Sequence, residues 1–505
     1  MHKKDVESIL SALKSVKVKT AAALRQFLKD TDEGHVDADK DHLTARQRID
    51  AFFDEGTFVE IGAFVKKRPS PICVDGGDDF ESVICGYGAV CGRLVFAFAQ
   101  DFTRTKGALS EAHAKKICSL YRLACENGAP VVGIFDSAGA LLSDGVNALA
   151  GYGRIMSAVS AASGVIPQIA VVPGLCAGTA ATLAAMFDAI VTVTDKTALY
   201  VNSPFVLGEN GDAEYADKTG LSAIKATDEA TAFAYARMLL SYLPDNNYCG
   251  PDAMESRDDA NRASGVVAGD SAATILTKIV DDGKFLELYA SYADEMIVGL
   301  ASLGGNAVGI LANNHEKNGG KLTVVAARKA AKFISLCDCF GLPVITLVDS
   351  EGLDVSLEAE SSPYAAELAK LAYAYTSAEA PVITVVTGEA YGAVYTLMGS
   401  KSLGADLALA LESAKIGVMN AERAVAFLCN DKIGTIDEDG EELTREALEK
   451  KWNDTLGSAA EAAYAGEIDD IIDASELRAR LIAAVEMLAS KNKLSYDKRH
   501  VNLPL

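Results

Sequence analysis

The strongest constraint on the fold of this chain is an internal duplication. Residues 114–139, AKKICSLYRLACENGAPVVGIFDSAG, are similar to residues 328–352, RKAAKFISLCDCFGLPVITLVDSEG. Each segment contains a helical pattern, a turn with glycine and proline, an apolar strand and a final Asp-Ser-x-Gly. Self-similarity of this kind indicates one supersecondary unit used twice. The sequence therefore predicts two similar domains with two similar sites.

A second pair of similar segments follows the first. Residues 166–185 and 380–399 both run from an apolar strand into a turn of small residues that opens a helix. Asp136 precedes Gly178 by 42 positions, and Asp349 precedes Gly392 by 43. A turn of this kind presents unpaired backbone N–H groups at the positive end of a helix dipole, where an anionic oxygen is stabilised. Tight strand-to-helix packing is the alternative explanation, and the repetition favours a functional role.

Composition limits the class of protein. With 505 residues, half of them apolar, the chain can form two or three cores. The net charge of −23 argues against a nucleic-acid partner, because phosphate binding needs a basic surface. Ten scattered cysteines and six histidines lack metal-ligand spacing, so we expect no metal site and no disulfide framework. The N-terminal residues contain no unbroken apolar stretch, so we expect a cytoplasmic protein.

Helical and strand patterns alternate between Leu109 and Val193. This alternation predicts βαβ units whose strands are buried on both faces, an α/β fold. Residues 81–102 predict a hairpin in the first domain, and we expect hairpin strands at 307–312 and 322–326 in the second. The polar and aperiodic residues 244–270 are the best candidate linker.

The common catalytic motifs are missing from the sequence. There is no nucleophile elbow, no phosphate-binding GxxxxGK[ST] loop, no HExxH and no dinucleotide fingerprint. Gly86, Gly88 and Gly92 resemble a phosphate loop, but they fall between predicted strands and favour a hairpin turn. His113 is a candidate base, although a single histidine early in a helix is more often structural.

Several longer segments then carry a family resemblance. They include LTARQRIDAFFDEGTFVEIG at 43–62, GVNALAGYGRI at 145–155, MGSKSLGADLALA at 398–410 and the terminal KRHVNLPL. The chain resembles, over almost its whole length, the biotin-dependent acyl-CoA carboxyltransferases, the family of the propionyl-CoA carboxylase β subunit and of the decarboxylase carboxyltransferase subunits. The resemblance implies two tandem crotonase-like (ClpP/crotonase) domains. The domain for acyl-CoA is expected at 1–265 and the domain for biotin at 266–505.

The resemblance also implies the residues of the site. In the family, backbone donors matching Gly178 and Thr179 hold the thioester oxygen, and donors matching Ala393 and Val394 hold the ureido oxygen of biotin. Biotin then serves as the base, so that no side-chain acid or base is needed. The other expected substrate-binding residues are Gly107, Ala108, Ala138, Gly139, Gly392 and Thr396.

The resemblance implies partners as well. The chain lacks a biotin-attachment motif of the AMKM type, so we expect biotin on a separate carrier protein. A biotin carboxylase or a membrane decarboxylase subunit is the further partner expected. Six copies of the chain are expected to form a homohexameric ring, with each active site between domains of two subunits.

Departures from the family pattern are compatible with an unusual substrate or with lost chemistry, and two alternatives to carboxyl transfer stay open. Leu141 replaces an arginine, Thr179 replaces a glycine, and Glu351 and Glu367 replace other family residues. One alternative is a non-catalytic paralogue that scaffolds a carboxylase or decarboxylase ring. The other is a crotonase-type hydratase or hydrolase, which would need a side-chain acid or base, with Asp144 and His113 as candidates.

Overall fold

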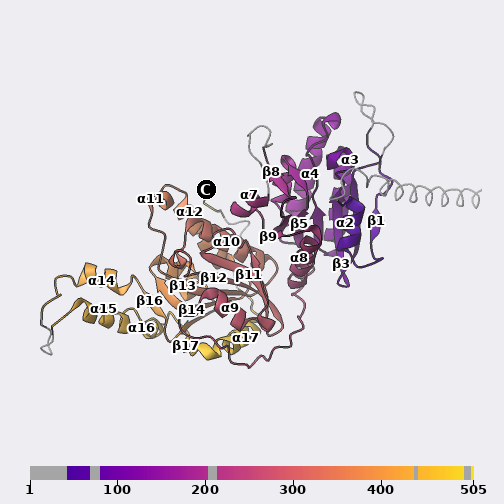
Figure 1. Cartoon of the computed structure of the whole chain (residues 1–505). Coiled ribbons are helices and arrows are strands. Elements are labelled where there is room, and N and C mark those ends of the chain that lie inside the picture. Colours follow the sequence, from indigo (N-terminus) through magenta and orange to yellow (C-terminus); the bar gives the residue numbers. More distant parts are fainter. Residues whose placement is uncertain (1–42, 69–79, 203–212, 437–441, 494–501, 505) are drawn as a thin grey trace, which may run out of the picture. The chain divides into compact units, whose positions relative to one another are not determined.

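Figure 1 shows the computed structural model, which describes residues 43–68, 80–202, 213–436, 442–493 and 502–504. The chain divides into two compact units. Unit 1 contains Met1–Ala216 and Lys225–Met238, and unit 2 contains Asp217–Ile224 and Leu239–Leu505. The expectation of a cytoplasmic protein rests on N-terminal residues that lie outside the described residues. Most of the terminal KRHVNLPL also lies outside them. The division at residue 265 remains a prediction.

A seven-stranded sheet forms the centre of unit 1, in the order β1-β2-β3-β4-β5-β7-β9. Strands β1 to β3 pair antiparallel, whereas β3, β4, β5 and β7 pair in parallel. A separate two-stranded parallel sheet consists of β6 and β8. The strands are β1 (Val59–Ile61), β2 (Val83–Val90), β3 (Arg93–Gln100), β4 (Val131–Ile134), β5 (Gln168–Val172), β6 (Leu175–Ala177), β7 (Ala189–Val193), β8 (Ala198–Tyr200) and β9 (Ile224–Ala226).

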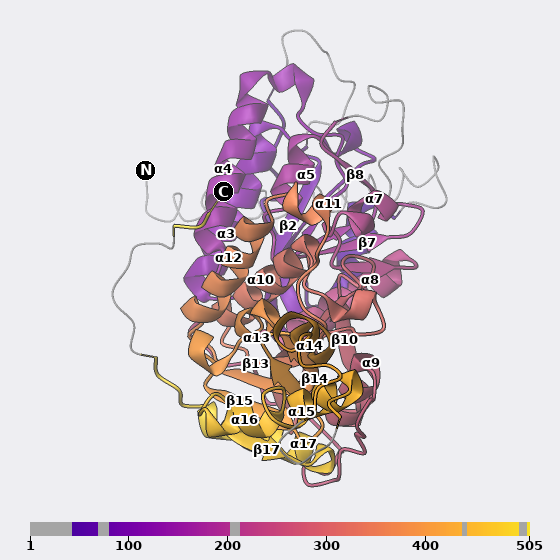
Figure 2. The same ribbon diagram turned by 90° about the vertical axis from the view of Figure 1, so that its left-hand side faces the viewer.

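The helices associated with this sheet have clear start and stop signals. Thr44 and Gln47 form a capping box at the start of α2, and the Ser110 side chain caps α3. Gly128 ends α3 in a left-handed conformation, with φ 60°. Figure 2 shows α3 and α4 lying side by side. The helices are α2 (Ala45–Phe52), α3 (Glu111–Asn127), α4 (Val146–Ala162), α5 (Thr179–Ala184), α7 (Ala213–Lys218) and α8 (Glu229–Tyr242).

Unit 2 repeats this plan around an eight-stranded sheet, in the order β10-β11-β12-β13-β14-β15-β17 with β16 paired to β14. Its strands are β10 (Phe285–Leu288), β11 (Met296–Leu303), β12 (Asn306–Asn313), β13 (Val344–Ser350), β14 (Val382–Tyr391), β15 (Leu407–Leu411), β16 (Lys415–Gly417) and β17 (Asp470–Ile472). Its helices are α9 (Ala272–Ile279), α10 (Val324–Cys339), α11 (Leu357–Glu360), α12 (Tyr364–Ser377), α13 (Ala393–Leu397), α14 (Ala421–Leu428), α15 (Arg445–Asp454), α16 (Ala459–Tyr464) and α17 (Leu477–Leu488).

Helices cover both faces of the unit 2 sheet. Val308 and Ile310 on β12 belong to one buried apolar cluster with residues of α9 and α17. Gly309 lies between them and faces α10, since a Cβ there would lie 2.3 Å from the sulfur of Cys337. Alternate residues of a strand point to opposite faces of the sheet. The strands are therefore buried on both sides, as their continuous apolar runs predict.

The duplication extends beyond the segments that reveal it in the sequence. Asp54 follows α2 and accepts hydrogen bonds from the Gly92 N–H and from Arg237, whose Nη2 lies 2.6 Å away. Asp281 follows α9 and accepts hydrogen bonds from the Gly305 N–H and from Arg478, also at 2.6 Å. The prediction of two similar α/β domains is confirmed in these contacts.

Two secondary-structure expectations have different outcomes. The hairpin expected at 81–102 is confirmed as β2 and β3, and Gly86 and Gly88 lie within β2. In unit 2 the hairpin consists of β11 and β12, so the prediction of a strand at 322–326 was wrong. The β-branched Thr323 suggests a strand, but its hydroxyl oxygen accepts the Ala326 N–H and caps α10.

The segment at 244–270 contains no helix or strand, in keeping with its aperiodic sequence. The nine cysteines among the described residues are all free thiols. Within the described part of the chain, we find no helix that combines the length and the apolar character needed to cross a bilayer.

Candidate functional site

A buried aspartate fixes the chain that leads to the turn at Gly178 in unit 1. Asp136 follows β4, and its Oδ1 accepts the Leu175 N–H at 3.1 Å. Two residues that lie close to Asp136 in space must be glycine. A Cβ at Gly174 would lie 2.5 Å from the Asp136 carboxylate, and a Cβ at Gly107 would lie 2.0 Å from its backbone oxygen. The carboxylate therefore sets the start of β6, which ends directly before Gly178.

The Asp136 carboxylate is neutralised by a buried arginine. Arg48 on α2 places Nη1 2.6 Å from Asp136 Oδ2 and Nε 2.8 Å from Glu229 Oε2. All three side chains are nearly inaccessible to solvent, with 1%, 3% and 4% of their surfaces exposed. Burial lowers the pKa of Arg48, but the two carboxylates outweigh burial and the net shift is upward. The ion pair thus ties α2 and α8 to the loop that carries Asp136.

The turn itself presents one outward backbone donor at its first helical residue. Gly178 has φ 63° and ψ −127°, a conformation that favours glycine. Its N–H donates to the Tyr200 carbonyl oxygen at 2.8 Å, across the β6-β8 pair. Thr179 begins α5 and is exposed. Its N–H donates to no oxygen of the described residues. Of the two expected donors, Gly178 is therefore engaged within the fold and Thr179 is available.

Unit 2 builds its turn with the same parts. Asp349 Oδ1 accepts the Glu389 N–H at 2.9 Å. A Cβ at Gly388 would lie 2.2 Å from the same carboxylate oxygen, and a Cβ at Gly320 would lie 2.3 Å from the Asp349 backbone oxygen. Gly392 has φ 61° and ψ −139°, nearly the values of Gly178. The two turns are therefore equivalent in conformation as well as in sequence.

The donors of the unit 2 turn follow Gly392. The Gly392 N–H donates to the Gly417 carbonyl oxygen at 2.9 Å, the counterpart of the Gly178 bond. Ala393 is exposed at the start of α13, and Val394 is buried. The Ala393 N–H has no acceptor among the described residues. Thr396 is exposed one helical turn later, where its carbonyl oxygen accepts the Ser400 hydroxyl.

The two aspartates differ in the side chains that lie beside them. Asp349 Oδ1 lies 3.3 Å from Nδ1 of His315, whose side chain is 41% exposed. Asp136 is instead paired with Arg48, which is 1% exposed. The unit 1 turn is therefore supported by a buried ion pair, whereas the unit 2 aspartate lies beside a partly exposed imidazole.

The other expected substrate-binding residues of unit 1 lie on two loops that the fold brings together. The Leu109 N–H donates to the Gly139 carbonyl oxygen at 2.8 Å, and the Ala138 N–H donates to the Lys106 carbonyl oxygen at 2.9 Å. The N–H groups of Gly107 and Ala108 also bond within their own loop. Ala138 is exposed, whereas Gly107, Ala108 and Gly139 are buried. These residues therefore offer small apolar surfaces rather than free donors.

Both candidate side-chain bases are engaged within the fold. His113 is fully buried, with its Nε2 3.5 Å from the Gln100 amide nitrogen. Asp144 accepts the Glu111 N–H at 2.6 Å, near the start of α3. Within the described ranges, no three His, Cys, Asp or Glu side chains gather as ligands for a metal. The geometry therefore directs attention to the backbone donors of the two turns.

His113 also predicts how stability changes with pH. Burial lowers the pKa of its imidazole from 6.5 to about 3, and Lys116 adds to this effect. Between these values the unfolded chain binds more protons than the folded chain, so stability falls as pH decreases. We expect His113→Gln to remove about 1.4 kcal/mol of this loss for each pH unit. Urea unfolding of both proteins across this range measures the difference, and equal slopes would contradict the assignment.

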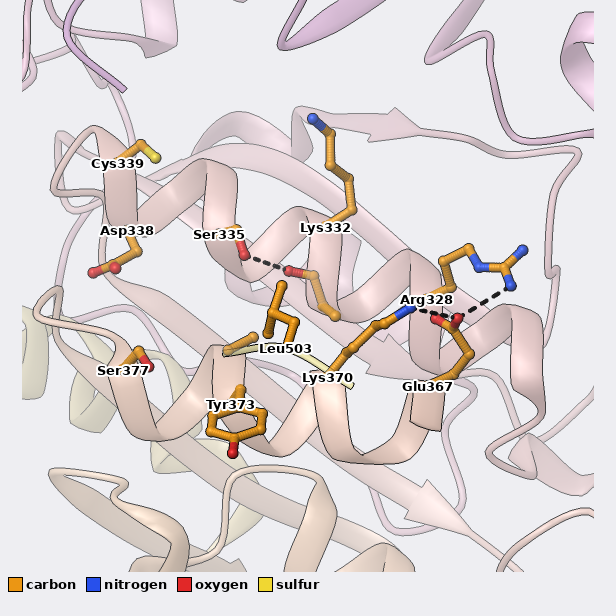
Figure 3. Close-up of a pocket in the computed structure, with 12 residues that line it drawn as sticks. Arg328, Lys332, Ser335, Asp338, Cys339, Glu367, Lys370, Tyr373, Ser377 and Leu503 are labelled. Atoms are coloured by element: carbon orange, nitrogen blue, oxygen red, sulfur yellow. Dashed lines mark hydrogen bonds and ion pairs between the residues drawn. The ribbon is translucent and has the colours of Figure 1, made fainter. Parts of the chain in front are cut away.

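Unit 2 also has a surface groove between α10 and α12. Figure 3 shows the Glu367 carboxylate between Arg328 and Lys370, at 3.3 and 3.0 Å. These ion pairs hold the pKa of Glu367 low although burial raises it. The departure at Glu367 is thus explained by its ion pairs in this groove. The groove is lined by residues of both helices and by the C-terminal tail, including Ser335, Cys339, Tyr373 and Leu503.

Sequence reasoning missed three residues that support the turns. Arg48 and Glu229 lie far from Asp136 in the chain, and no local pattern links them. His315 was also missed because it follows β12 in a polar loop. The Asp-Ser-x-Gly repeat identifies Asp136 and Asp349, but their partners become visible only once the helices and loops are placed.

Comparisons with known proteins give a consistent result. Residues 37–503 match the family model described as the carboxyl transferase domain. The chain is 37% identical over 488 residues to the propionyl-CoA carboxylase carboxyltransferase subunit of Haloferax mediterranei, covering 92% of this chain and 94% of that protein. It is 36% identical over 510 residues to the methylmalonyl-CoA decarboxylase subunit alpha of Propionigenium modestum, covering 97% and 98%.

A solved structure extends these similarities to the fold. Transcarboxylase 12S, a hexamer crystallised with methylmalonyl-coenzyme A and methylmalonic acid, matches with a TM-score of 0.89 and 31% sequence identity. The match covers 97% of this chain and 99% of that chain. The predicted fold of two tandem crotonase-like domains is confirmed by this similarity.

Proposed function

This chain belongs to the carboxyl transferase family, and on that premise we propose that it transfers a carboxyl group between biotin and the α-carbon of a short acyl-CoA. The observation that carries the proposal is the pair of equivalent turns, in which Thr179 and Ala393 each present an unengaged backbone N–H. Relatives named for propionyl-CoA and methylmalonyl-CoA support a short acyl chain. During the transfer, negative charge develops on the thioester oxygen and on the ureido oxygen of biotin. Each of the two donor turns can stabilise one of these charges.

The unit 1 turn is proposed as the acyl-CoA side, within residues 1–265. The Thr179 N–H donates to the thioester oxygen as the α-carbon loses or gains its carboxyl group. Gly178 supplies the backbone conformation that aims this N–H outward. Substrate binding is completed by small residues that let the thioester approach the backbone, namely Gly107, Ala108, Ala138 and Gly139.

The unit 2 turn is proposed as the biotin side, within residues 266–505. Ala393 and Val394 donate their N–H groups to the ureido oxygen, and Gly392 sets the backbone. Thr396 is a substrate-binding residue that influences the choice of acyl chain. The residues fit the group, because the exposed Ala393 carries only a methyl. Biotin, when bound in its carboxylated form, supplies the carboxyl group and the base. The chain itself contributes positioning and electrostatic stabilisation.

Assembly and partners follow from the same premise. We propose a homohexamer, which the hexameric transcarboxylase 12S supports. Biotin arrives on a separate carrier protein, and a biotin carboxylase or a membrane decarboxylase subunit completes the system. The methylmalonyl-CoA decarboxylase relative supports the second of these partners. The ten scattered cysteines support a cytoplasmic location.

A transfer assay tests the proposed function. Purified protein is given free biotin and a panel of malonyl-CoA and methylmalonyl-CoA, and the loss of the carboxylated thioester is followed with and without biotin. We expect loss only when biotin is present. An assembled ring without transfer would favour the non-catalytic scaffold, for which Thr179 and Leu141 are the motivating departures. Hydration or hydrolysis of acyl-CoA without biotin would favour the crotonase-type enzyme.

A further inference from the structure

The two turns have the same backbone conformation, but the side chains that flank them differ in polarity. The glycine beside the aspartate carbonyl is followed by Ala108 in unit 1 and by Lys321 in unit 2. Two residues after the aspartate, unit 1 has Ala138 and unit 2 has Glu351. Small apolar residues in unit 1 thus correspond to an ion pair in unit 2, where Lys321 Nζ lies 3.3 Å from Glu351 Oε2.

A second pair of equivalent positions shows the same change. The residue whose N–H bonds to the aspartate is Leu175 in unit 1 and Glu389 in unit 2. Their parallel partners on the neighbouring strand are Ala198 and Lys415. Lys415 Nζ lies 3.2 Å from Glu389 Oε1. All four flanking positions are therefore apolar in unit 1, and in unit 2 they form two ion pairs.

Both ion pairs adjoin the unit 2 turn. Glu351 directly precedes Gly352, where a Cβ would lie 3.8 Å from the Tyr391 carbonyl oxygen. Tyr391 in turn directly precedes Gly392. The other pair spans β14 and β16, whose last residues are Tyr391 and Gly417, and Gly417 accepts the Gly392 N–H. The charged groups therefore border the chain on either side of Gly392.

We propose that these two ion pairs are specificity-determining residues, which make the unit 2 turn select a carboxylated cyclic urea and reject an acyl chain. The inference rests on the proposed function and deepens it. An ammonium group donates strong hydrogen bonds to a carboxylate. Lys321 and Lys415 can therefore exchange their glutamate partners for the carboxylate of the carboxylated urea. An acyl chain gains nothing from such a rim, because it would desolvate the charges without pairing them.

Accessibility favours this exchange. The side chains of Lys321 and Glu351 are 31% and 47% exposed, and those of Lys415 and Glu389 are 46% and 29% exposed. Exposed pairs contribute little to folding, so they are free to be replaced by a ligand. In unit 1 the corresponding alanine and leucine side chains offer an apolar rim that suits an acyl thioester.

The test converts the unit 2 rim into that of unit 1. The double variant Lys321→Ala, Glu351→Ala reproduces the residues at positions 108 and 138. With carboxybiotin as carboxyl donor and propionyl-CoA as acceptor, we expect the KM for carboxybiotin to rise about 10- to 100-fold, because a charged hydrogen bond to its carboxylate is lost. The KM for propionyl-CoA is expected to remain unchanged.

The matched control removes an exposed ion pair on α3, using Arg122→Ala, Glu126→Ala, whose atoms lie 2.7 Å apart. This control is expected to leave both KM values unchanged, and the conservative Lys321→Arg, Glu351→Asp is expected to restore the KM for carboxybiotin. An unchanged KM for carboxybiotin in the alanine variant, or an equal rise for both substrates, would overturn the inference while leaving the proposed function intact. A wild type without biotin-dependent transfer would overturn both.

Discussion

Replacing Thr179 by proline is expected to lower carboxyl transfer by about a hundred- to thousandfold, the usual cost of losing one oxyanion donor. Proline removes the N–H, and Thr179 is the first residue of α5, the one helical position where proline fits without strain. The preceding Gly178 has a ψ of −127°, outside the α region that a following proline disfavours. Initial rates of biotin-dependent loss of methylmalonyl-CoA measure the effect.

The control for this variant is Thr179→Ala, which keeps the N–H and removes the side chain that crowds the approach. It is expected to transfer at least as fast as the wild type. Ala393→Pro makes the equivalent change at the first residue of α13 and is expected to lose activity to a similar degree. If either proline variant folds normally and transfers at the wild-type rate, the donor assigned to that turn is wrong.

Replacing Arg48 by methionine is expected to destabilise unit 1 by about 3–5 kcal/mol, the range for breaking a buried ion pair. The change leaves the Asp136 carboxylate buried without its cation, and it removes the Nε contact to Glu229. Lys196, 3.3 Å from Glu229, compensates only part of this loss. The first unfolding transition in urea, followed by circular dichroism, measures the change.

Arg122→Met is the matched control for Arg48→Met. Arg122 pairs with Glu126 on the surface of α3, and 59% of its side chain is exposed. A pair of this kind contributes no more than about 1 kcal/mol. Equal and small effects of the two variants would show that Arg48 is not the support of Asp136 that its contacts indicate.

The sequence is sufficient to identify the duplication and both turns, because a strand, a glycine and a helix start are local patterns. Asp136 and Asp349 emerge from the same repeat. The sequence does not show which backbone N–H groups of the turns are free. The Gly178 N–H bonds to Tyr200, whose position depends on how β8 pairs with β6. Local patterns also led to the wrong prediction of a strand at 322–326, where Thr323 is the N-cap of α10.

The departures from the family pattern acquire separate explanations in the structure. Glu351 forms an ion pair with Lys321 beside the unit 2 turn. Glu367 lies between two cations in the groove of α10 and α12. Thr179 keeps its N–H available at the exposed start of α5. The N–H of Leu141 bonds to the Leu109 carbonyl oxygen, and nothing in the structure explains the loss of an arginine there.

In the proposed function the two turns have different roles, with the thioester at Thr179 and biotin at Ala393. Amide hydrogen exchange of the assembled protein, read by mass spectrometry, tests this division most directly. Propionyl-CoA is predicted to slow exchange in peptides that contain Thr179 and to leave those with Ala393 unchanged, and biotin is predicted to do the reverse. Protection of the same turn by both ligands, or of neither turn by either ligand, would contradict the account.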